Sequence, residues 1–136
     1  MEPDTVQTVH IRGLAERADS PVHRLGPDVT VPETLPVLVE FSHAVPPAGT
    51  ARLTRDDEGI HADATLYLVG WLRQMAQKHD LRSLWPKFAL GIARTVITED
   101  EGGGAVIIAG EVVSLSLCRE NVDRDLPPWK VVPDGT

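Results

Sequence analysis

The chain contains the run Leu35-Pro36-Val37-Leu38-Val39-Glu40-Phe41-Ser42-His43, which is almost continuously apolar until it ends in a histidine. A continuous apolar stretch of this length predicts a strand that is buried on both faces. A second apolar run, Phe88-Ala89-Leu90-Gly91-Ile92, lies downstream and contains neither a hydroxyl nor a thiol. Ser42 is adjacent to His43, but neighbouring residues on a strand face opposite ways, so the two should not meet. A histidine base without a hydroxyl or thiol to activate has no proton to remove, so these two runs predict no nucleophilic catalysis.

The remaining apolar pattern is mostly that of strands. Residues 60–66 alternate cleanly, and the expected inward face consists of Ile60, Ala62, Ala64 and Leu66. Helical spacing occurs once, on a face formed by Leu68, Trp71, Leu72 and Met75. Residues 17–34 hold three prolines and predict a long irregular connection, a kind of segment that is often functional or mobile. We therefore expect a mainly β (α+β) domain with one or two helices and strands at 6–16, 35–41, 48–53, 60–66, 88–98 and 105–118.

Composition excludes several classes of protein. The 136 residues are enough for one domain with a real core. The net charge of −7 without a basic cluster disfavours nucleic-acid binding, and no apolar run is long enough to cross a membrane. The acidic N-terminus is not that of a secretory signal. The single Cys118 cannot form an internal disulfide and suits a reducing cytoplasm, and no metal-ligand spacing predicts a cofactor.

The order and spacing of several motifs over residues 6–122 resemble those of the prohead proteases of tailed bacteriophages, which share a fold with the herpesvirus assembly proteases. The strand that leads to the family's histidine is similar to residues 35–44, and the turn after it to 47–50. The acidic hairpin that follows corresponds to 56–60. The strand that carries the family's nucleophilic serine resembles Phe88-Ala89-Leu90-Gly91-Ile92, and its last strand resembles 112–116.

The departures from this family decide the expected activity. The resemblance makes His43 the catalytic base, but the serine position falls on Ala89 and the acidic position falls on Val112. Glu111 is one residue away, which on a strand places it on the opposite face. Two of the three catalytic positions are therefore lost. His43 is either a relict base or a structural histidine satisfied by hydrogen bonds at a strand end, and the lack of a nucleophile favours the structural role.

The resemblance also implies a prohead-protease-like domain at 1–122, folded as a single closed or partly closed antiparallel β-barrel, followed by an extended Pro-rich tail at 123–136. In the tail, Leu126, Pro127, Pro128 and Trp129 form a candidate partner-binding segment, because extended Pro-rich arms lose little entropy on docking. The alternative is that Trp129 folds back to cover its own domain.

Other reactive residue types have simpler explanations. Ser114 and Ser116 share one face of the last strand and are expected to be strand serines, since no base motif accompanies them. Cys118 is expected to be a small buried apolar group. The acidic hairpin Asp56-Asp57-Glu58 is expected to be a solvated turn, because it lacks the ligand pattern of a calcium loop.

Two functions remain. The first is a non-catalytic virion protein, assembled in the host cytoplasm, that decorates or cements the shell by binding the major capsid protein or other virion subunits and that could form homo-oligomers. The alternative is a maturation protease that cleaves scaffold and capsid protein, with His43 as base and the Leu90 and Gly91 amides as oxyanion site. A weaker third possibility is a pseudoprotease that binds scaffold peptide in the old cleft without cutting it.

Overall fold

Strands dominate the structure because small apolar and polar residues alternate along most of the chain. The computed structural model describes residues 7–20, 23–42, 46–121 and 123–133. The predicted inward face of 60–66 is buried, as expected. The described residues form nine strands and two helices: β1 (Gln7–Arg17), β2 (His23–Leu25), β3 (Val29–Thr30), β4 (Thr34–Val39), β5 (Gly49–Asp56), β6 (Gly59–Leu68), α1 (Gly70–Lys78), α2 (Leu81–Leu84), β7 (Lys87–Glu99), β8 (Ala105–Cys118) and β9 (Lys130–Val132).

All nine strands belong to one mixed sheet with the order β2-β8-β4-β5-β6-β1-β9, in which β3 and β7 also pair with β8. Strands β2, β3 and β4 run parallel to β8, whereas the other pairs are antiparallel. Within the described residues β7 pairs only with β8, and β9 only with β1, so the sheet has open edges. The prediction of an antiparallel β-barrel is therefore wrong.

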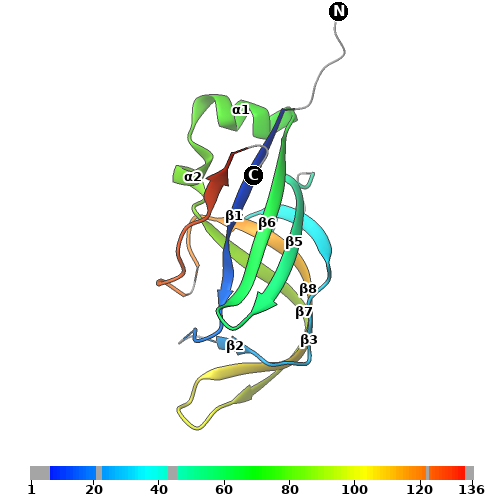
Figure 1. Cartoon of the computed structure of the whole chain (residues 1–136), viewed down its shortest axis with the longest axis vertical. Coiled ribbons are helices and arrows are strands. Elements are labelled where there is room, and N and C mark those ends of the chain that lie inside the picture. Colours follow the sequence, from blue (N-terminus) through cyan, green and yellow to red (C-terminus); the bar gives the residue numbers. More distant parts are fainter. Residues whose placement is uncertain (1–6, 21–22, 43–45, 122, 134–136) are drawn as a thin grey trace, which may run out of the picture.

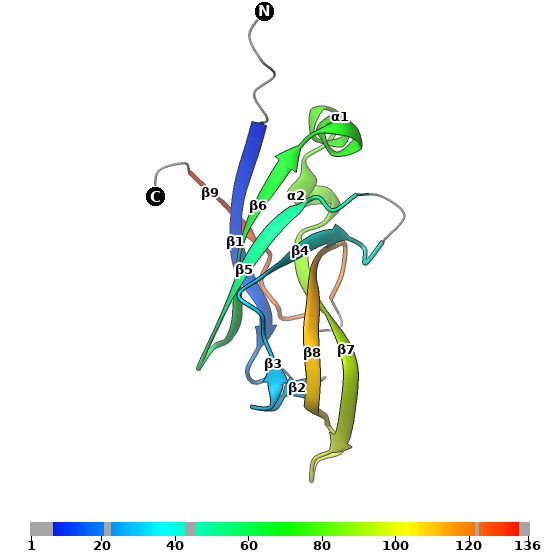
Figure 2. The same cartoon turned by 90° about the vertical axis from the view of Figure 1, so that its right-hand side faces the viewer.

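Strand β4 turns the corner of this sheet. Its residues 34–37 pair with β5, and its residues 37–39 pair with β8. The long crossover from β4 to β8 allows the parallel pairing, which a hairpin connection would not. As a result, the β1, β5 and β6 layer lies across the β7 and β8 layer (Figures 1 and 2).

The core lies between these two layers. Its fully buried side chains include Ile11 of β1, Ile60 and Leu66 of β6, Phe88 of β7 and Leu115 of β8, and β4, α1 and the tail contribute others. Helix α1 packs over one end, where Leu72 is 1% exposed and Trp71 and Met75 lie against the core. The predicted helical face is thus confirmed, although the helix begins at Gly70 rather than at Leu68.

The connection at 17–34 is not irregular throughout. It contains β2 and β3, which pair with β8, and Arg55 of β5 holds it by donating to the carbonyl oxygens of Leu25 and Gly26 at 2.5 and 3.0 Å. Strands of three and two residues are too short to produce a periodic pattern, which is why the sequence did not predict them.

The described part of the tail, 123–133, packs on the same core. Trp129 is 2% exposed and Leu126 is 1% exposed. The Trp129 ring stacks on Phe88 with 6.4 Å between centroids, and its Nε1 donates to the Trp85 carbonyl oxygen at 2.7 Å. Both side chains are therefore core residues rather than a partner-binding surface, as in the alternative in which Trp129 covers its own domain. Pro127 is exposed and Pro128 is half-buried, so partner binding at these two residues stays a prediction.

Candidate functional site

The residue at the expected nucleophile position, Ala89, lies on β7, whose other edge carries no strand within the described residues. Its partner across β8 is Ser116, and the partner of Gly91 is Ser114. Because residues directly opposite each other in an antiparallel pair share a face, the methyl of Ala89 and the hydroxyl of Ser116 lie on the same side of the sheet.

The segment after β4 covers this face. Glu40 and Phe41 take left-handed backbone angles, with φ of 51° and 57°, which turn the chain sharply at the end of the strand. The Phe41 amide then donates to Ser116 Oγ at 3.1 Å, and the Glu40 amide donates to the Leu117 carbonyl oxygen at 2.9 Å. His43 lies outside the described residues, so its predicted role as a relict base stays a prediction.

The alcohols nearest to Ala89 are packed into the protein. Ser116 is 0% exposed and Ser114 is 5% exposed. A Cβ added at Gly91 would lie 2.3 Å from Ser114 Oγ, so this glycine is needed for the close approach of β7 and β8. The interpretation of Ser114 and Ser116 as strand serines agrees with this burial, because neither hydroxyl is open to a substrate carbonyl.

Cys118 is also closed to chemistry. Its side chain is buried, and burial together with the nearby Glu40 carboxylate raises the pKa of its thiol to about 12. The thiol is therefore protonated at neutral pH and is a poor nucleophile. The prediction of a small buried apolar group is confirmed.

The acidic position of the resemblance does not lie beside Ala89. Val112 is 1% exposed and pairs with Ile92, and Glu111 pairs with Ala93. A register shift between Gly91 and Ile92 inserts one extra residue on β8, which no sequence pattern reveals. The residue that faces Ala89 is thus Ser116, which the sequence predicted to be a strand serine.

A cleft with a volume of about 340 Å³ opens at this edge of β7. Its walls are mostly apolar, and its polar groups are the carboxylates of Glu16 and Glu120, the Asn121 amide and the Thr95 hydroxyl. Glu16 is only 7% exposed. Sequence reasoning missed Glu16, because an acidic residue at the end of a strand carries no motif. The other lining residues are Phe41, Ala89, Leu90, Ile92 and Ile107.

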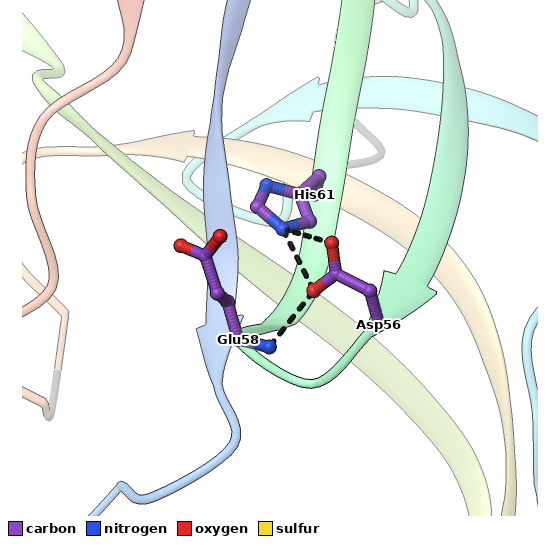
Figure 3. A group of neighbouring side chains, drawn as sticks. All are labelled: Asp56, Glu58 and His61. Atoms are coloured by element: carbon purple, nitrogen blue, oxygen red, sulfur yellow. Dashed lines mark hydrogen bonds and ion pairs between the residues drawn. The ribbon is translucent and has the colours of Figure 1, made fainter.

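A second group of side chains, far from this cleft in sequence, could hold a cation. The β5–β6 turn places Asp56, Glu58 and His61 so that one ligand atom of each lies within 4.8 Å of the others. His61 Nε2 lies 3.0 Å from the Asp56 carboxylate, which also accepts a hydrogen bond from the Glu58 amide at 2.9 Å (Figure 3). These bonds, that of the Glu58 amide foremost, lower the pKa of Asp56. The hairpin is exposed, as predicted, and pairing within the group accounts for its arrangement without an ion.

Among the described residues, no helix is both long and apolar enough to cross a membrane. No family profile matches the sequence, and no curated protein matches it.

Solved structures of the protease of the herpesvirus KSHV are similar to this chain. One KSHV protease structure matches with a TM-score of 0.61 at 15% identity, over 94% of this chain and 62% of that one. A KSHV protease in complex with a hexapeptide phosphonate inhibitor matches with a TM-score of 0.63, also at 15% identity, over 94% of this chain and 66% of that one. The chain has the assemblin-like fold.

The fold implied by the resemblance to herpesvirus assembly proteases is therefore confirmed. The chain spans about two thirds of the length of these proteases, 62% and 66%. At 15% identity the likeness establishes the fold alone.

Proposed function

We propose that this chain is a non-catalytic, prohead-protease-like protein of a tailed-phage virion, which decorates or cements the capsid by holding an extended segment of another capsid subunit. One observation carries the proposal. The cleft that an assemblin-like fold presents on β7 is lined by the methyl of Ala89, while Ser114 and Ser116 beside it are buried.

Of the described residues that line the cleft, Thr95 alone carries a hydroxyl. It lies six positions after Ala89 on β7, beyond the register shift between Ala93 and Val96, where Arg94 takes a left-handed φ of 56°. Its hydroxyl does not occupy position 89, so the cleft suits binding better than hydrolysis.

The open edge of β7 supplies the means of binding. An edge strand presents unpaired main-chain groups, to which an extended peptide can add as a further strand. The structure of the KSHV protease with a hexapeptide phosphonate inhibitor supports a peptide ligand for this fold. A contact of about 1,000 Å² would be enough for specific docking, and repetition over a capsid lattice would add avidity.

Labelling with a fluorophosphonate probe tests the absence of catalysis. We expect no labelling of the unmodified protein, because the probe requires an activated nucleophile. Labelling that is lost in His43→Ala would refute the proposal and favour the maturation-protease alternative. Labelling lost only in Thr95→Ala would identify an unforeseen nucleophile and would refute it equally.

Mass spectrometry of purified mature virions tests the structural role. A decoration protein is expected in the particles at a fixed ratio to the major capsid protein. Absence from mature particles, with presence in immature proheads, would contradict decoration and would indicate an assembly factor.

A further inference from the structure

A second cavity of about 280 Å³ adjoins the cleft beside Ala89 and is lined by Lys87, Arg119, Glu120, Asn121 and Arg124. Glu120 and Asn121 line both cavities, and the two together are called the groove below. Asn121 is fixed at this junction, because its Nδ2 donates to the Phe88 carbonyl oxygen at 2.8 Å and its Oδ1 accepts from the Asp123 amide at 2.8 Å.

The part of the groove at Ala89 is acidic. Glu16 and Glu120 line it, and none of its described lining residues is a lysine or an arginine. Glu16 lies in a mostly apolar wall and is 7% exposed, so a carboxylate here interacts with a ligand charge more strongly than one in water would. Arg17, the next residue along β1, is directed elsewhere: its Nε and Nη2 donate to Asp123 at 2.6 Å each.

The part of the groove at Lys87 is basic. Three cationic side chains, Lys87, Arg119 and Arg124, line it against one carboxylate, Glu120. Lys87 Nζ donates to the Leu126 carbonyl oxygen. Arg119 and Arg124 are exposed, and neither forms a side-chain ion pair with another described residue. A ligand carboxylate in this cavity could accept from both guanidinium groups.

The groove thus has opposite charges at its two ends, along β7. No strand within the described residues pairs with this edge of β7, and at the junction the Phe88 carbonyl oxygen already accepts from Asn121, so an added segment would pair with the residues of β7 that follow Phe88. Antiparallel addition is the more stable mode of strand pairing. An antiparallel segment on β7 has its earlier residues beside Ala89 to Thr95 and its later residues beside Lys87.

We propose that the groove selects extended peptide segments in which a lysine or arginine precedes an aspartate, glutamate or C-terminal carboxylate. The basic side chain pairs with Glu16 and Glu120, and the acidic group pairs with Arg119 and Arg124. This inference rests on the proposed function, since it names the segment that the non-catalytic cleft holds.

Selection from a phage-displayed library of random dodecapeptides on the immobilised full chain tests the peptide-holding function and the charge order of the peptide separately. We expect the enriched peptides to carry a basic residue before an acidic one. If no peptide is enriched, the peptide-holding function itself fails. If peptides are enriched without this charge order, or with the reverse order, the function stands and the charge inference is overturned.

Two variants and two matched controls locate the effect. In fluorescence anisotropy with one enriched peptide, Glu16→Gln should weaken binding by about tenfold, the size of one charge-assisted hydrogen bond. Arg119→Gln should do the same for the acidic end. Glu33→Gln and Arg52→Gln remove the same charges from an exposed ion pair outside the groove and should leave binding unchanged.

A further variant and two measurements on the unmodified chain test the proposal even if Glu16→Gln does not fold. Glu120→Gln changes an exposed side chain and should also weaken a peptide with a basic residue more than its norleucine analogue. Binding by the unmodified chain should fall with rising salt. Equal affinity for the lysine and norleucine peptides at low salt would overturn the proposal without any substitution.

Discussion

Replacing Trp129 with alanine removes the largest fully buried side chain of the core, and with it the anchor of the C-terminal tail. The side chain is 2% exposed, and its ring stacks on Phe88. A buried tryptophan truncated to alanine costs about 3–5 kcal/mol of unfolding free energy. Against a total of about 5–15 kcal/mol for a domain, this is a large fraction. We expect the melting temperature to fall by roughly 10–20 °C.

Urea unfolding followed by far-ultraviolet circular dichroism measures this loss. Trp129→Phe separates two contributions, because phenylalanine keeps an aromatic ring against Phe88 but loses the 2.7 Å hydrogen bond to the Trp85 carbonyl oxygen. It should cost less than the alanine variant, with about 1 kcal/mol from the hydrogen bond. Val131→Ala is the control, since Val131 lies in the same tail and is 60% exposed.

The result that would refute this reasoning is a Trp129→Ala variant whose stability matches that of Val131→Ala within about 0.5 kcal/mol. The tail would then not be part of the core in solution. The docking arm expected from the Pro-rich sequence would become the better description of residues 123–136.

Three further predictions concern charge and pH. Arg17→Ala should lower the urea midpoint of unfolding, because Asp123 is 3% exposed and loses both 2.6 Å hydrogen bonds from the guanidinium group. A midpoint equal to that of Arg52→Ala, which breaks an exposed ion pair, would show that the Arg17–Asp123 pair does not hold the tail. With a pKa of about 12, the Cys118 thiol should react slowly with a disulfide reagent at pH 8 until urea unfolds the chain, and rapid labelling of the folded protein would contradict its burial. Because a thiol in the unfolded chain ionises near pH 8.5, the free energy of unfolding should fall as the pH rises from about 8.5 to 12. In NMR titration, the pKa of Asp56 should lie below the usual range, and His61→Ala should leave part of that lowering, because the Glu58 amide is its largest single cause. A return to the ordinary pKa in His61→Ala would show that His61 dominates.

Some features of the candidate site follow from the sequence, and others depend on the tertiary structure. The absence of a hydroxyl at position 89 is a matter of residue identity, and the burial of Cys118 follows from ordinary preference. The pairing of Ala89 with Ser116 was not predictable, because the register shift between Gly91 and Ile92 displaces the β8 partners of residues 87–91 by one residue. Glu16 and Asn121 are more than 100 positions apart in the chain, and only the packing of β1 against β7 brings both to one cleft.

The sequence by itself determined which residues alternate, and therefore that 60–66 is a strand with one buried face and that 105–118 is a long strand, although not the final one. Such patterns are local, so they assign a face to a strand but not a neighbour. The tertiary structure decided that β4 joins β8 in parallel, that Trp129 belongs to the core, and that His61 meets Asp56. The first two depend on contacts between residues far apart in the chain, and the third on the register of a hairpin; the free energy of the whole fold selects such contacts, and local periodicity does not encode them.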